Sequence, residues 1–97
     1  MAQYIMVSKK LLDRLRAAFK RYGSQVLGDP DITIDFFPTE IDGFFKVLLN
    51  SPNFQKMGYT ERQNSIWDYL SADPEITEED LRYITQIATE AEEVELV

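Results

Sequence analysis

The acidic residues between Asp29 and Glu40 have the spacing that comes nearest to a metal site. In a calcium loop of the EF-hand type, the oxygen ligands come from the first, third, fifth, seventh and twelfth positions. Those positions are held here by Asp29, Asp31, Thr33, Asp35 and Glu40. The sharp-turn position, which requires glycine, is Ile34, and the stretch DITIDFF alternates as a strand does. The pattern therefore favours a strand with a solvated acidic side over a calcium loop.

Other chemistry is restricted by the residue types that the chain lacks. It contains no cysteine and no histidine, which excludes thiol catalysis, thiolate metal sites and acid–base work by imidazole. The acidic run at 78–80 holds neighbouring carboxylates, but carboxylates act as an acid–base pair only in a pocket that makes them titrate differently. The sequence indicates no such pocket. We therefore predict a protein that is not an enzyme and uses no cofactor or metal of its own.

The charge is unevenly distributed along the chain. Residues 1–28 carry six Lys and Arg against one Asp, a net of +5, and residues 29–97 carry four against sixteen acidic residues, a net of −12. The sum is the formal net charge of −7. Because an acidic body repels phosphate, nucleic-acid binding is disfavoured and could start only at the basic first segment.

Length and hydropathy predict a single domain over residues 1–97, with 1–7 and 94–97 as tails. Of the 97 residues, 44% are hydrophobic, which is enough for one core. No stretch approaches the ~18 apolar residues of a membrane span, and the apolar run in MAQYIMVSKK is too short for a signal peptide. A soluble, cytoplasmic protein without membrane contact is the expectation.

The first half of the chain predicts a helix and a hairpin. Residues 8–22 have a helical stripe, with Ser8 as its N-cap and Gly23 as the left-handed residue that ends it. Residues 31–37 alternate as a half-buried strand, and a second apolar run follows over 44–49. Phe37 and Phe45 interrupt the alternation, so a partner-facing apolar patch could include both of them.

The next element is a helix over 60–70. Thr60 and Gln63 have the spacing of a capping box, and an inner stripe follows. The residues of that stripe are Ile66, Trp67 and Leu70.

Two periodicities compete in the last third. Leu81, Ile84, Ala88 and Ala91 trace a helical stripe that Thr77 could cap, whereas Leu81, Tyr83, Thr85, Ile87 and Thr89 would share one side of a strand. Periodicity leaves both open. A two-stranded hairpin is marginal by itself, so a third strand over 81–88 would help to close the core.

The order of these elements and several short strings resemble the BolA-like family. FFKVLLNSPNF at 44–54 is similar to the family's second-strand phrase, and Glu61-Arg62 is similar to the pair that opens the following helix. That helix ends with IWDYL at 66–70, and LRYITQIATEAEE at 81–93 is similar to the third strand and its continuation. The resemblance covers about residues 8–93.

This resemblance implies an α+β domain with a three-stranded sheet and helices packed on one face, in the order α-β-β-α-α-β-α. That arrangement is similar to the class II KH fold. The resemblance also implies that residues 81–88 are a strand.

BolA-like proteins place histidine beside a glutaredoxin's cysteine to share an iron–sulfur cluster. Here Arg82 replaces the third-strand histidine, Phe44 that of the second-strand phrase, and Gln63 the one after Glu-Arg. A guanidinium stays protonated and cannot bind iron. The resemblance therefore implies a protein-interaction module without metal ligation by its own side chains.

The expected partner is another protein, with a glutaredoxin-like protein as one candidate. The residues of this chain that are expected to contact the partner are Phe44, Lys46, Arg62 and Arg82. The alternative is a nucleic-acid-binding regulator of KH-like shape that uses the basic first helix.

Overall fold

The computed structural model describes residues 9–92. Its elements, in order, are α1 (Lys9–Tyr22), the π-helical turn η1 (Gly23–Leu27), β1 (Thr33–Pro38), β2 (Phe45–Asn50), the 3-10 helix η2 (Pro52–Lys56), α2 (Tyr59–Ala72), α3 (Glu78–Arg82) and β3 (Ile84–Glu90). The predicted α+β class and three-stranded sheet are confirmed. Strand β1 begins two residues later than the sequence predicts, and β2 begins one residue later.

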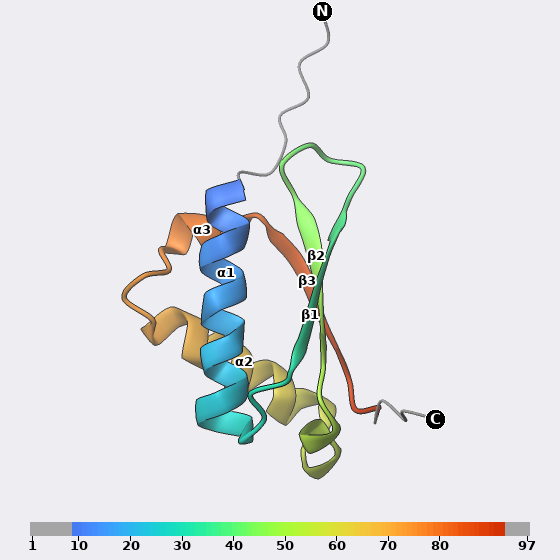
Figure 1. Ribbon diagram of the computed structural model, residues 1–97. Coiled ribbons are helices and arrows are strands. Elements are labelled where there is room, and N and C mark those ends of the chain that lie inside the picture. The colour runs from blue at the N-terminus through green and yellow to red at the C-terminus, as the bar shows by residue number, and fades with distance from the viewer. Residues whose placement is uncertain (1–8, 93–97) are drawn as a thin grey trace, which may run out of the picture.

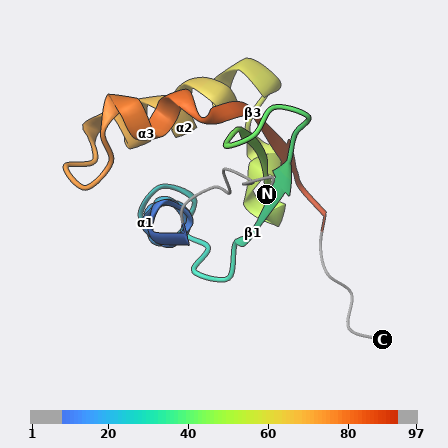
Figure 2. The ribbon, with the colours of Figure 1, turned by 90° about the horizontal axis from the view of Figure 1, so that it is seen from above.

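Strand β2 is the centre of a mixed sheet. It pairs antiparallel with β1, Phe36 opposite Val47, and parallel with β3, Val47 opposite Ile87. Helices α1, α2 and α3 all lie on the same side of this sheet (Figures 1 and 2). Residues 9–92 therefore form two layers, and within this range no helix covers the other face of the sheet.

The core lies between the helices and the inner face of the sheet. Alternate residues of β2 point into it, and its exposed or half-buried residues point away. The buried residues of the strands are Ile34, Phe45, Val47, Leu49, Ile84 and Ile87. Those of α1 and α2 are Leu11, Leu15, Ala18, Phe19, Tyr22, Ile66 and Leu70. The predicted stripes of both helices are thus in the core, except that Leu12 and Trp67 are only partly buried against it.

The end of the first helix differs from the prediction. Gly23 is not left-handed; the helix runs into η1, and Gly28, with φ of 67°, ends it by donating to the Gly23 oxygen. Glycine is required at 23 for another reason. An added Cβ would lie 2.5 Å from Ile32 Cγ2 and 2.7 Å from the Asp29 oxygen. Ser8, the predicted N-cap, lies outside the described residues.

The predicted capping box of the second helix is wrong. Helix α2 begins at Tyr59, with Gly58 as its N-cap and no side-chain cap hydrogen bond. Gln63 instead donates to the Ile87 oxygen of β3 at 2.7 Å and accepts from Trp67 Nε1 at 3.2 Å. The Gln63 side chain is therefore hydrogen-bonded to the sheet, and not to the start of α2 as a capping box would require.

The disputed segment contains both a helix and a strand. Thr77 and Asp80 form a capping box at the start of α3, which ends at Arg82, so Leu81 is helical and not the start of a strand. Strand β3 then pairs with β2 as predicted. A bulge at Thr85 shifts the alternation by one residue, so that Ile84 and Ile87 both face the core. Ile84 and Ile87 are three positions apart, which is also a spacing found along one side of a helix, so the segment fits both a strand and a helix.

The final helix of the predicted order would follow β3. Residues 91 and 92 are neither helical nor extended in a strand, and residues 93–97 lie outside the described residues. Within residues 9–92, no helix is long and apolar enough to cross a membrane.

Candidate functional site

Three of the four predicted contact residues lie near the end of the sheet where β2 and β3 begin. Phe44 directly precedes β2, and its ring centroid is 5.6 Å from that of Tyr83. Lys46 is exposed on β2, and Arg82 is the exposed last residue of α3. The parallel pairing of β2 and β3 therefore brings these residues to one end of the domain.

The fourth residue, Arg62, lies elsewhere. Its Nε donates to the Met57 oxygen at 2.9 Å and its Nη1 to Thr89 Oγ1 at 3.2 Å. Its guanidinium carbon also lies over the Phe54 ring, 5.5 Å from the ring centroid, within the range of a cation–π contact. These contacts tie α2 to η2 and β3, which is a structural role within the domain.

The uncovered face of the sheet is the first candidate interaction surface. We call it the outer face, and the register and alternation of the strands assign to it Thr33, Asp35, Phe37, Lys46, Leu48, Asn50, Gln86, Ala88 and Glu90. Phe37 is 47% exposed there, whereas Phe45 on the inner face is 1% exposed. The pair of aromatics suggested for an apolar patch is therefore split between the two faces.

The hairpin loop extends this surface with an ordered tip. Ile41 is 62% exposed. The Thr39 hydroxyl lies 3.0 Å from the backbone oxygens of Ile41 and Phe44 and accepts from the Ile41 N–H at 3.2 Å. The loop thus holds an apolar side chain in solvent with its backbone already hydrogen-bonded.

Both edges of the sheet carry side chains that cap backbone oxygens. Arg16 donates to the Ile34 oxygen at 3.1 Å and Lys20 to the Ile32 oxygen at 2.9 Å, along β1 and the residue before it. On β3, the Gln63 side chain donates to the Ile87 oxygen. A partner strand would have to displace these groups to pair with an edge, so the outer face is the more accessible surface.

The basic residues of α1 are largely engaged within the domain. Besides Arg16 and Lys20, Arg14 binds Asp80 at 2.9 Å, and Arg21 binds Asp73 at 2.6 Å and Glu75 at 3.3 Å. Four of the six basic residues in 1–28 therefore hold α1 against β1, α3 and the loop after α2. A nucleic acid would compete with these contacts for the same cations, which weakens the alternative function.

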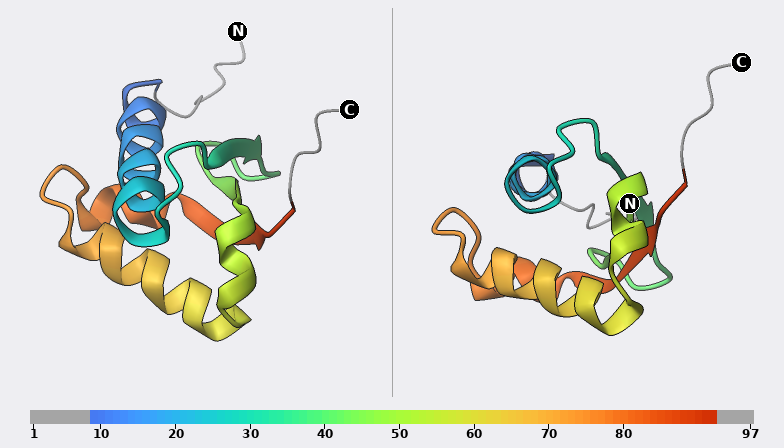
Figure 3. Two further views of the ribbon diagram at one scale, coloured as in Figure 1. Left: turned by 60° about the horizontal axis from the view of Figure 1, so that its bottom comes forward. Right: turned by 90° about the horizontal axis from the view of Figure 1, so that it is seen from below.

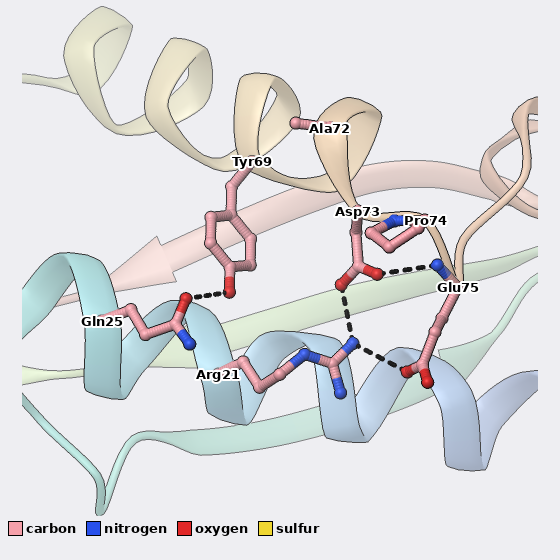
Figure 4. Close-up of a pocket in the computed structure, with 7 residues that line it drawn as sticks. All are labelled: Arg21, Gln25, Tyr69, Ala72, Asp73, Pro74 and Glu75. Carbon is pink, nitrogen blue, oxygen red and sulfur yellow. Dashed lines mark hydrogen bonds and ion pairs between the residues drawn. The ribbon is translucent and has the colours of Figure 1, made fainter.

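A cleft lies where η1 and the end of α1 meet the end of α2. It has a volume of about 460 Å³ and is lined by Arg21, Gln25, Tyr69, Ala72, Asp73, Pro74 and Glu75. Figure 4 shows the Tyr69 side chain of α2 pointing towards Gln25 of η1, and the Asp73 side chain, directly after α2, pointing towards Arg21 of α1. The Tyr69 hydroxyl donates to Gln25 Oε1 at 2.6 Å. This cleft is the second candidate binding surface.

The ion pair in the cleft shifts the pKa values of Arg21 and Asp73. The hydrogen bond from Arg21 holds the pKa of Asp73 below its ordinary value, and it outweighs the opposite effect of burial. The same bond raises the pKa of Arg21. Asp73 therefore keeps its charge to a lower pH than an ordinary aspartate does, and its side chain is only 6% exposed.

This shift predicts acid sensitivity that depends on Asp73. A carboxyl whose pKa is lowered by folding stabilises the fold above its unfolded pKa of about 3.9, and that contribution is lost as pH falls through the lower folded pKa. We expect Asp73→Asn to reduce the free energy of unfolding by about 1–2 kcal/mol near pH 7, because a hydrogen bond to a charged group is lost. Urea unfolding should show this difference shrinking below about pH 4.

Glu75→Gln is the matched control for that measurement. The Glu75 side chain is 67% exposed and its contact with Arg21 is longer, at 3.3 Å, so its removal should change stability by less than about 0.5 kcal/mol. A loss for Asp73→Asn that is the same at acid and neutral pH would contradict the assignment.

In the acidic stretch that was compared with a calcium loop, Asp29 makes hydrogen bonds within the domain. Asp29 Oδ1 accepts from the Asp31 N–H at 2.9 Å, and Asp29 Oδ2 accepts from the Ser51 hydroxyl at 2.6 Å. Thr33 and Asp35 lie on β1. Within the described part of the chain, no group of three or more acidic side chains is arranged to hold a metal ion.

The comparisons give no relative for this chain. No family model, no curated protein and no solved structure matches it. The BolA-like resemblance therefore stays a prediction.

Sequence reasoning missed the cleft entirely. Its members come from two stretches of the chain, 21–25 and 69–75, and Arg21 and Asp73 are 52 positions apart. The available signal was the Asp-Pro at the end of the second predicted helix together with a basic residue in the last turn of the first. Neither signal indicates that the two helix ends meet.

Proposed function

We propose that this chain is a non-enzymatic protein-interaction module of BolA-like type, which binds another protein through the outer face and the hairpin tip. The proposal draws on the order of elements from α1 to β3, which is the order that the resemblance implies before its final helix. The observation that carries the proposal is the 47% exposure of Phe37 on a sheet face that none of the helices within residues 9–92 covers, together with the 62% exposure of Ile41 on the adjoining hairpin loop. Exposed apolar groups gathered on one surface are typical of an interaction site.

The chemistry of the surface indicates the kind of contact. Lys46 lies between Phe37 and Gln86 across the strands, and Asp35 lies opposite Leu48. A surface with apolar side chains and charges of both signs suits a folded protein better than a polyanion. A glutaredoxin-like protein is the first partner to test, on the family resemblance alone, and its contact would not depend on a shared iron–sulfur cluster.

The test is affinity capture with matched double variants. The variant Phe37→Ser with Ile41→Ser removes apolar side chains from the proposed surface. We expect it to weaken capture of the partner at least about ten-fold, because truncating central apolar anchors costs ~2 kcal/mol or more. The experiment should use a purified glutaredoxin and an extract of the native source, with the bound fraction quantified against protein concentration.

The control is Val26→Ser with Tyr59→Ser. Val26 and Tyr59 are 47% and 71% exposed but lie on η1 and at the start of α2, away from the outer face. The control should bind like the unaltered chain. Equal binding by all three proteins would contradict the proposed surface, and the absence of any specific protein partner would contradict the proposed function.

A further inference from the structure

The cleft between η1 and the end of α2 has an apolar wall held in place by hydrogen bonding and packing. The Tyr69 ring meets the Tyr22 ring edge-on at 5.6 Å, while its hydroxyl is bound to Gln25. Ala72 and Pro74 continue the apolar lining (Figure 4). A volume of about 460 Å³ is enough for one large side chain with its stem.

The charges in the cleft favour a cation. Arg21 is opposed by Asp73 and Glu75, so the ionisable groups of the lining sum to −1. Asp73 uses both oxygens within the domain, one for Arg21 and one for the Glu75 N–H. Glu75 is different: its side chain is 67% exposed, and its Oε2 lies 3.3 Å from Arg21. A carboxylate has about four acceptor sites, so Glu75 can accept from a second donor without releasing Arg21.

We propose that this cleft binds the guanidinium group of an arginine on a partner protein. Glu75 accepts hydrogen bonds from the guanidinium, and the Tyr69 ring packs against it. A guanidinium fits better than an ammonium because it is planar, stacks on aromatic rings and presents a fork of donors to a carboxylate. Helix α2 ends at Ala72, and its C-terminal carbonyl groups add negative partial charge on this side of the cleft.

The partner is a protein segment and not a free small molecule. An exposed ion pair and an exposed cation–aromatic contact are each weak, so the cleft holds a guanidinium firmly only as part of a larger contact. The cleft is lined by residues of α1, η1 and the end of α2. These elements lie on the helical side of the sheet, and the outer face lies on the other side (Figures 1 and 3). It is therefore a second contact, separate from the proposed sheet surface.

The test is an NMR titration of the full chain with the capped peptide acetyl-Gly-Arg-Gly-amide. We expect chemical-shift changes concentrated at Tyr69, Asp73 and Glu75. Glu75→Gln should lower the association constant about two- to five-fold, the effect of one exposed ion pair. Glu40→Gln makes the same charge change on the exposed hairpin loop and should leave the association constant unchanged.

Matched peptides with Lys or Glu in place of Arg decide the chemistry. The Lys peptide should bind more weakly than the Arg peptide, and equal binding would overturn the guanidinium assignment. A Glu peptide that binds as well, or that gains affinity from Glu75→Gln, would make the cleft an anion site. An absence of shifts with the Arg peptide, or equal weakening by Glu40→Gln, would overturn the proposal. None of these results depends on whether the outer face binds a partner.

Discussion

Replacing Phe45 with alanine is expected to lower the free energy of unfolding by about 3–5 kcal/mol. Phe45 begins the central strand, is 1% exposed and packs edge-on against Phe36 with 5.7 Å between ring centroids. The flanking backbone is fixed, because the Phe45 N–H donates to the Tyr83 oxygen at 2.9 Å and its oxygen accepts from Thr85 Oγ1. Neighbours held in this way cannot collapse fully into the cavity, which keeps the cost high. Urea denaturation measures it directly.

Phe37→Ala is the matched control, since it makes the same truncation on the opposite face of the same sheet. Phe37 is 47% exposed, so its loss should cost less than about 1 kcal/mol. A loss for Phe37→Ala as large as that for Phe45→Ala would contradict the exposure of Phe37 on an uncovered face, and the proposed interaction surface would be withdrawn.

Gly23→Ala is expected to destabilise the domain by about 1–3 kcal/mol, although alanine is the better helix former. The new Cβ would meet Ile32 Cγ2 at 2.5 Å and the Asp29 oxygen at 2.7 Å. The Asp29 oxygen cannot move away easily, because the Asp29 N–H donates to the Gly23 oxygen at 2.7 Å and its side chain binds Ser51. The strain therefore falls on the connection from α1 to β1.

Gly58→Ala provides the comparison for this prediction. A Cβ at Gly58 meets nothing within 4 Å, so only the weaker N-cap preference of alanine remains, a cost below about 1 kcal/mol. Thermal and urea unfolding should rank the two variants in this order. A stabilised Gly23→Ala protein would show that the close approach of Ile32 does not exist.

The amphipathic elements could be predicted from the sequence because their burial depends on local spacing. The stripe of α1 and the alternation of β1 and β2 place apolar side chains at the period of each element, so the side that is buried follows from the pattern. Local spacing left residues 81–88 open between helix and strand; the family resemblance, and the need of a hairpin for further cover, favoured the strand. Local spacing could not find the Thr85 bulge, which depends on how β3 fits beside β2.

The helix ends and caps could be predicted less well, because contacts distant in sequence compete for the same groups. Gly23 looks like a helix terminator, but the close approach of Ile32 is what requires glycine there. Gln63 has the spacing of a capping residue, but its amide binds the Ile87 oxygen on β3. In each case a local preference worth about 1 kcal/mol is outweighed by the packing of the layers.

For the candidate sites, the sequence by itself determined which chemistry is absent and which side chains are available. Without cysteine or histidine, thiol and imidazole chemistry are excluded whatever the fold. Only the tertiary structure decided where the charges act. Arg14 and Arg21 look like a solvated basic stripe in the sequence, but they bind Asp80 and Asp73, which are 66 and 52 positions away. Pairings over such separations arise from the packing of α1 against the rest of the domain, and no local periodicity encodes that packing.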